Sequence, residues 1–174
     1  MTVEALRRRR PEALDDLLAV YGPELQATAY LILRDRADAE DVVVETLLTA
    51  YDKAGSIRDE RALRSWLYRV ATNHALSLRR SEARVVRLDV VPDAPAPGDL
   101  ARGATDHVAL MGAIDGLPRR TRAAVVLRYY ADLSVDDVAA AMGTSPNTVK
   151  TQLREALEQL RRRLADPTPE ARHA

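Results

Sequence analysis

The sequence predicts an all-α protein made of two small helical domains joined by a flexible linker, the second of them a helix-turn-helix domain. Signals that start and stop helices recur along the 174 residues, and no segment alternates apolar and polar residues for long enough to indicate a sheet. Residues 88–105 form a segment with a net negative charge that contains three prolines and two glycines. This segment separates two groups of helical signals. We therefore place the domains at residues 11–85 and 106–165, with the linker at 86–105.

The composition excludes several classes of protein. Cysteine is absent, which rules out disulfides and thiolate metal sites and makes the cytoplasm the default location. No apolar run approaches the roughly eighteen residues that cross a bilayer. A short apolar patch runs directly into Arg7–Arg10, which fits neither a signal peptide nor a membrane anchor. Catalytic pairs, phosphate loops and metal-ligand spacings are also lacking, so we expect no enzyme, cofactor or metal.

In the first domain, proline and glycine punctuate the helices. Pro11 can open a helix, and Gly22 with Pro23 should end it and start a second helix that continues to about Leu33.

The next two helices are predicted from capping signals and apolar spacing. A third helix should begin near Asp38, which has capping-box spacing with Asp41, and should stop at Gly55. A fourth helix should run from about Asp59 to about Arg84, because its apolar residues recur at helical spacing. We expect these four helices to form one bundle.

The second domain is predicted to begin with helices at about 106–114 and 118–130, and its most specific signal follows them. Ser134 and Asp137 have capping-box spacing, Gly143 suits a helix end with positive φ, and Ser145 with Pro146 can start the next helix. In that last helix we expect a buried stripe and an outward polar face. The buried stripe would be Val149, Leu153, Ala156 or Leu157, Leu160 and Leu164, and the outward residues Asn147, Thr148, Lys150, Thr151 and Arg154.

This corner has the geometry of a helix-turn-helix. Amide, hydroxyl and guanidinium groups in the first turns of the second helix can read base edges in a major groove, and a helix N-terminus favours phosphate. The alternative is an ordinary helical hairpin with a solvated face.

The net charge of zero conceals alternating acidic and basic segments. Residues 12–56 hold ten acids against three bases, and residues 57–87 hold eight arginines against three acids. Residues 88–106 are again acidic, and residues 145–165 hold five bases against two acids. Each basic segment could meet phosphate while the acidic helices face another partner, although helical surfaces are often charged without such a role.

The fourth helix carries arginines interleaved with aromatic and amide groups. This composition suits unpaired bases as well as duplex backbone. Trp66 also shares the apolar spacing and could belong to the core, His74 has no second ligand nearby and fits a structural role, and Asn73 could be an exposed spectator. The candidate residues on and before this helix are Arg58, Arg61, Arg64, Trp66, Arg69, Asn73, Arg79 and Arg80.

Three segments together resemble the extracytoplasmic-function class of bacterial sigma factors, within the sigma-seventy family. DAEDVVVETLLTAY at 38–51 is similar to the family's polymerase-docking helix, and LRSWLYRVATNHALSLRR at 63–80 is similar to its promoter-melting helix. The segment from 114 to 164 resembles its C-terminal domain, including the LP start and the corner with Gly143. The matches cover both domains and leave out the tails and the linker.

The resemblance implies a role for each segment. The arginine helix and the loop 55–62 would capture the melted minus-ten element, and the last helix would read the minus-thirty-five duplex through Ser145, Pro146, Asn147, Thr148, Lys150, Thr151 and Arg154. Core RNA polymerase and promoter DNA would be the partners, an anti-sigma factor is the family's common regulator, and no membrane is involved. Polymerase would dock on Asp38, Glu40, Asp41, Val44, Glu45 and Leu48.

Some residues depart from the family pattern. Val44 stands where glutamine is usual, Leu47 where an aromatic is usual, and Leu63 where phenylalanine is usual, so polymerase docking and the minus-ten preference are not carried over in detail. A second hypothesis remains, in which a DNA-binding regulator uses only the helix-turn-helix and acts without core polymerase. It leaves the arginine helix unexplained.

Overall fold

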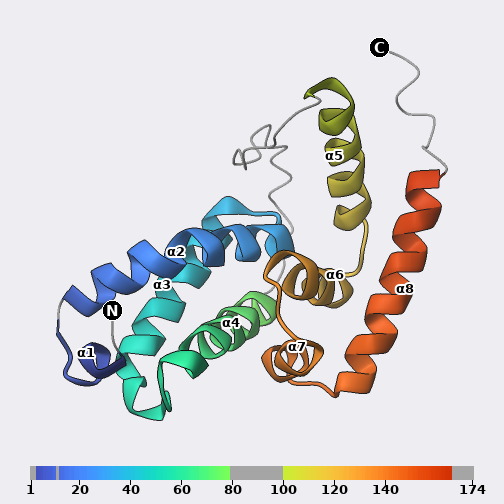
Figure 1. Ribbon diagram of the computed structural model, residues 1–174. Helices are drawn as coiled ribbons and strands as arrows, with labels where there is room; N and C mark the ends of the chain where they lie inside the picture. The colour runs from blue at the N-terminus through green and yellow to red at the C-terminus, as the bar shows by residue number, and fades with distance from the viewer. Residues whose placement is uncertain (1–2, 11, 79–99, 166–174) are drawn as a thin grey trace.

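The computed structural model describes residues 3–10, 12–78 and 100–165, with side chains from 106 onward in the last range, and every regular element in these ranges is helical. The all-α prediction is confirmed. Figure 1 shows α1 to α4 gathered on one side and α5 to α8 on the other. The elements in chain order are α1 (Val3–Arg7), α2 (Glu12–Leu33), α3 (Arg36–Asp52), the 3₁₀ turn η1 (Ala54–Ser56), α4 (Glu60–Ser77), α5 (Leu100–Asp115), α6 (Arg119–Val125), the π turn η2 (Val126–Tyr130), α7 (Val135–Met142) and α8 (Pro146–Ala165).

The first group of helices is built on α2, α3 and α4, which pack against one another. Their apolar faces bury large side chains such as Leu25, Ile32, Val42 and Leu67 completely or nearly so. Each fully buried leucine or isoleucine contributes about 1.5–3 kcal/mol relative to an exposed one. The short helix α1, which sequence reasoning did not predict, covers one end of this group and buries Val3 and Leu6.

The prediction that Gly22 and Pro23 separate two helices is wrong. Both residues lie inside the single helix α2, although an interior proline costs about 3 kcal/mol through a lost hydrogen bond and a ring clash. The second half of α2 buries Leu25, Ala29 and Ile32 against its neighbours, and this burial outweighs the local penalty. Gly22 is buried, and a Cβ there would lie 2.8 Å from Leu18 Cδ1, so glycine removes a steric conflict at this point.

Other helix ends differ from the predicted ones. The N-cap of α3 is Asp35, whose carboxylate accepts a hydrogen bond from the Asp38 amide at 3.0 Å, so the predicted Asp38–Asp41 box is one turn too late. Helix α4 is described as far as Ser77, and its predicted continuation to Arg84 lies outside the described residues. The same is true of most of the predicted linker, whereas α5 already begins at Leu100.

The second group packs α6, α7 and α5 against α8. The predicted helix at 118–130 is interrupted, because its second half widens into the π turn η2, which closes with a hydrogen bond from the Ala131 amide to the Val126 carbonyl at 3.0 Å. The chain then turns through Asp132, at a φ of 50°, into α7. Among the described helices, none has the length and apolar content needed to span a membrane.

The two groups also contact each other, chiefly where α4 lies against α7 (Figure 1). Arg34, after α2, forms an ion pair of 2.7 Å with Asp115 at the end of α5. The Arg119 guanidinium donates to the Leu78 carbonyl at 2.5 Å, and Arg64 bridges from α4 to the carbonyl of Ala131. These polar contacts join the first group to the second in this arrangement.

Candidate nucleic-acid interface

Three predicted helix-capping features form the corner between α7 and α8. Ser134 Oγ accepts from the Asp137 amide at 3.1 Å, and Gly143 ends α7 in the left-handed conformation at φ 61° and ψ 43°. Ser145 Oγ then accepts from the Thr148 amide at 3.1 Å, and Pro146 is the first residue of α8. The sequence therefore dictates this corner locally, and the corner sets the direction in which α8 leaves α7.

Helix α8 separates an apolar face from a polar one largely as predicted. Val149, Leu153, Ala156 and Leu160 are buried. Leu164 is an exception, since it is 44% exposed where the pattern predicted burial. The predicted outward residues are all exposed, namely Asn147, Thr148, Lys150, Thr151 and Arg154.

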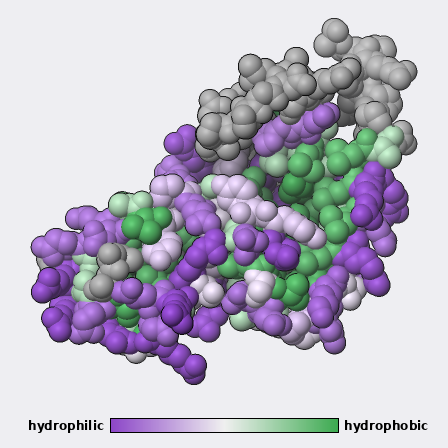
Figure 2. Space-filling model, viewed as in Figure 1, coloured by the Kyte–Doolittle hydropathy of each residue, from purple (hydrophilic) through white to green (hydrophobic). Residues whose placement is uncertain are grey.

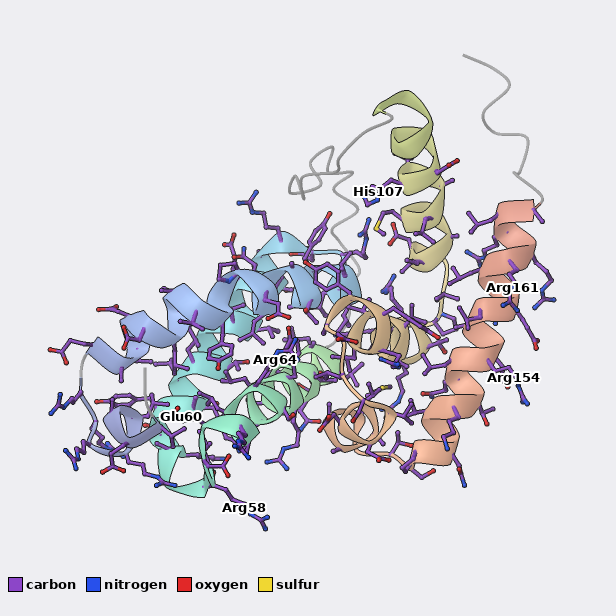
Figure 3. All side chains as sticks on the ribbon, in the orientation of Figure 1. Arg58, Glu60, Arg64, His107, Arg154 and Arg161 are labelled. Atoms are coloured by element: carbon purple, nitrogen blue, oxygen red, sulfur yellow. The ribbon has the colours of Figure 1, made fainter. Side chains whose placement is uncertain are left out.

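The exposed residues of α8 present hydrogen-bond donors and acceptors without an acidic neighbour in the first turn. Figure 3 shows Arg154 projecting from the outer side of α8, away from the rest of the fold. A guanidinium can bind guanine O6 and N7 together, and an asparagine amide can pair with adenine, so these groups can read base edges in a major groove. The positive end of the helix dipole at the N-terminus of α8 also favours an adjacent phosphate.

Helix α4 and the turn before it carry the second basic set. Arg58, Arg61, Arg69 and Asn73 are exposed. Trp66 is 8% exposed and lies with the core, so its ring is not part of the exposed surface in this arrangement. Arg79 and Arg80 lie outside the described residues.

Arg64 is placed differently from the other arginines of α4. Its Nη2 contacts Glu24 Oε1 and the Ala131 carbonyl oxygen, each at 2.7 Å, and its guanidinium lies 4.9 Å from the centre of the Tyr68 ring. Partial burial works to lower the pKa of Arg64, but the hydrogen bond and charge of Glu24 outweigh it and the pKa is raised. Burial also raises the pKa of the Tyr68 hydroxyl, which stays protonated at neutral pH.

The sequence provided no signal for this placement of Arg64. The arginine spacing alone makes it one more phosphate ligand, whereas the fold brings Glu24 and Ala131 to it from distant positions in the chain. Figure 3 shows Arg64 at the junction between the two groups of helices.

An acidic face of α3 points away from the core. Val44 and Leu48 lie one turn apart and are 55% and 47% exposed, with the exposed carboxylates of Asp41 and Glu45 on the same helix. Glu40 is exposed and accepts from Arg36 Nε at 3.2 Å, while Asp38 is half-buried in the first turn. Exposed apolar residues rimmed by charges are typical of a protein-binding surface.

Apolar residues are also exposed in the second group of helices. Figure 2 shows hydrophobic residues gathered between α5 and α8, whereas the surface over α1, α2 and α4 is mostly hydrophilic. Among the described side chains of α5 and α8, the exposed large apolar residues are Val108, Leu110 and Leu164.

Comparison with known proteins identifies the two groups of helices. Residues 17–85 match the family model "Sigma-70 region 2", and residues 107–160 match "Sigma-70, region 4". The chain is 34% identical to the ECF RNA polymerase sigma factor SigM of Mycobacterium tuberculosis, over 87% of this chain and 77% of that protein. The chain belongs to the ECF sigma factors of the sigma-70 family. The predicted function is thereby confirmed: this sigma factor is a non-enzymatic subunit of RNA polymerase, with regions 2 and 4 for promoter recognition.

Other relatives support the same assignment. The sigma factor is 30% identical to SigV of Bacillus subtilis, over 76% of its own length and 80% of that protein. Among solved structures, the sigma factor RpoE of Bartonella quintana, in complex with the anti-sigma factor NepR, matches with a TM-score of 0.68 and 26% identity, covering 90% of this chain and 99% of that one. CnrH, in complex with the cytosolic domain of CnrY, shares the fold with a TM-score of 0.69 and 22% identity, covering 95% and 96%.

Proposed function

We propose that this sigma factor reads the minus-thirty-five duplex with α8, through Ser145, Pro146, Asn147, Thr148, Lys150, Thr151 and Arg154. The observation that carries the proposal is the coincidence of a capped, glycine-terminated corner with exposed polar side chains in the first turns of the helix that follows. Only the first turns of a recognition helix reach base edges, because the rest of the helix is carried away from the groove floor.

Capture of the melted minus-ten element is assigned to the loop 55–62 and the exposed face of α4. Arg58, Arg61 and Arg69 would hold phosphates, and Asn73 would contact a base. Arg64 is placed differently, because its Nη2 is engaged with Glu24 and with the Ala131 carbonyl between the two regions. Binding flipped bases offsets the unstacking cost of a few kcal/mol per step.

Core polymerase is proposed to dock on α3. The exposed Val44 and Leu48 offer an apolar centre, and Asp41 and Glu45 offer negative charge beside it. A partner with an apolar strip and basic residues would complement this face in both packing and charge. Asp38 and Glu40 extend the acidic edge toward the N-terminus of the helix.

The domain limits 11–85 and 106–165 are part of the same proposal, and an anti-sigma factor is proposed as a regulator. RpoE of Bartonella quintana was solved with such a partner, which supports the second point. The role in transcription would place the protein in the cytoplasm, with the polymerase and the chromosome.

Pull-down of core polymerase, followed by promoter-dependent transcription, tests the proposal. The reconstituted holoenzyme is expected to select promoters with two conserved elements from a random DNA library, and core polymerase alone is expected to select none. Duplex binding by the isolated protein without any binding to core polymerase would contradict the proposal and favour a regulator that acts alone.

A further inference from the structure

The N-terminal helix α1 docks beside the loop that is proposed to hold the minus-ten element. Val3 and Leu6 are buried and anchor α1 against η1 and α3. The Arg7 guanidinium donates to the carbonyl of Ile57 at 2.6 Å and to that of Arg58 at 3.1 Å. Arg7 thus ties the first residues of the chain to the loop 55–62.

The backbone after α1 is held in a defined turn. Arg9 has a φ of 51°, its carbonyl accepts from the Tyr51 hydroxyl at 2.9 Å, and its guanidinium lies 5.8 Å from the centre of the Tyr51 ring. The Arg10 amide donates to the Ala5 carbonyl at 3.1 Å. A non-glycine residue with positive φ is sustained by such surrounding contacts, so the backbone of the turn has a defined conformation.

Three arginines, Arg8, Arg9 and Arg10, are exposed on this turn and form what we call the arginine turn. Glu4 is an acidic partner of this turn, since its Oε1 accepts from Arg8 Nε at 3.0 Å and its Oε2 lies 3.9 Å from Arg7 Nη1. The neighbouring elements contribute further charges of both signs. The bases are Lys53, Arg58 and Arg61, and the acids are Glu12, Asp15, Asp52, Asp59 and Glu60.

Two features give this mixed set a basic character. Asp59 is engaged as the N-cap of α4, where it accepts from the Ala62 amide at 2.9 Å. The bases also outnumber the acids, seven to six when Arg7 and Glu4 are counted, in contrast to the acidic α2 and α3 that follow. Figure 3 shows Arg58 projecting away from the fold at the turn between η1 and α4.

We propose that the arginine turn binds phosphates of the promoter strand whose bases are held by the loop 55–62. The inference rests on the proposed minus-ten role of that loop. Arg7 binds the loop backbone directly, so a strand seated on the loop passes within reach of long side chains on the adjoining turn. The contacts add affinity that is independent of sequence and falls with salt, because each neutralised phosphate releases condensed counterions.

The test compares holoenzymes on fork-junction promoter DNA that is single-stranded across the minus-ten element. The variant is Arg8→Gln with Arg10→Gln, which leaves the Arg9 turn intact. The matched control removes two exposed charges from the far end of α8, as Arg161→Gln with Arg162→Gln. Binding is measured between 50 and 200 mM salt, and affinity for core polymerase and the thermal melting temperature are measured in parallel.

Loss of two single-strand phosphate contacts should make the slope of log K against log salt less negative by about 1.4, or by about 1.8 if the contacts are to duplex. The control should keep the wild-type slope, and Arg10→Gln alone should show about half the effect, which separates charge loss from misfolding. An unchanged slope in the double variant, an equal change in the control, or a loss confined to core polymerase binding would overturn the inference.

Failure of the proposed function would give a different experimental result from failure of the inference about the arginine turn. If wild-type holoenzyme itself neither binds nor opens the selected promoter, the minus-ten assignment fails, and the inference about the arginine turn fails with it. If wild-type holoenzyme is active and the double variant matches it in slope, only the arginine turn is rejected.

Discussion

Gly143, at the corner between α7 and α8, offers a sharp test of how the helix-turn-helix is built. Its φ is 61°, and a Cβ added there would meet no atom within 4 Å. The cost of Gly143→Ala is therefore conformational and not steric. An L-residue in the left-handed region costs about 1–2 kcal/mol, so we expect the free energy of unfolding to fall by about that amount.

A second glycine supplies the matched control. Gly112 lies inside α5, where an added Cβ also meets nothing within 4 Å and no positive φ occurs. Gly112→Ala should therefore raise the free energy of unfolding by about 0.5–1 kcal/mol, because alanine loses less backbone entropy in a helix. The same substitution is thus predicted to have opposite signs at the two positions.

Urea unfolding followed by circular dichroism measures both changes, with the denaturant slope checked for constancy. Gly143→Asn should cost less than Gly143→Ala, because asparagine visits the left-handed region more readily. Binding of a minus-thirty-five duplex by the holoenzyme should follow the same order. A neutral or stabilising Gly143→Ala, or equal costs for asparagine and alanine, would refute the reasoning.

Three further predictions concern two exposed residues, Arg154 and Val44, and one half-buried carboxyl group, that of Asp115. Arg154→Ala in the holoenzyme should weaken binding of the selected promoter by about 1–3 kcal/mol if Arg154 contacts a base edge; equal losses on all sequences in a binding titration would make it a phosphate contact instead. Val44→Asp should reduce core polymerase binding at least about tenfold in a pull-down titration, whereas Val20→Asp, at a similarly exposed position on α2, should not; equal effects would remove α3 as the docking face. Burial raises the pKa of Asp115 despite the nearby Arg34 and Arg122, so the folded state binds the proton more tightly than the unfolded state; stability should rise as pH falls through the folded pKa. In urea unfolding at several pH values, the stability of the wild type relative to Asp115→Asn should therefore increase toward acidic pH, and parallel pH profiles would contradict it.

Local signals in the sequence were sufficient to predict the structure where the backbone conformation depends on residues close together in the chain. Ser134 and Ser145 each accept from an amide three residues on, and the Gly143 amide donates to carbonyls of the preceding turn. Their roles at the corner could therefore be predicted without knowledge of the rest of the fold. The outward residues of α8 followed from the same periodicity. The roles proposed for them in DNA binding remain predictions.

The errors arose where tertiary contacts overrode local signals. Pro23 marks a helix boundary by its own chemistry, but burial of the residues after it keeps α2 continuous. Leu164 has the spacing of a core residue, yet its side chain is 44% exposed. Trp66 fits both the apolar spacing of a core residue and the mixed arginine and aromatic composition of a base-binding surface. Only the packing shows that it lies in the core.

The sequence by itself determined the helical class, the division into two regions and the corner that aims α8, because these depend on spacing and on residues close together in the chain. Only the tertiary structure decided what Arg64, Arg34 and the arginine turn contact. Glu24 and Ala131 meet Arg64, Asp115 meets Arg34, and the loop at Ile57 meets Arg7, and each of these partners lies far away in the chain. An arginine carries the same charge in every context, so its role depends on which groups the packed helices bring within hydrogen-bond distance.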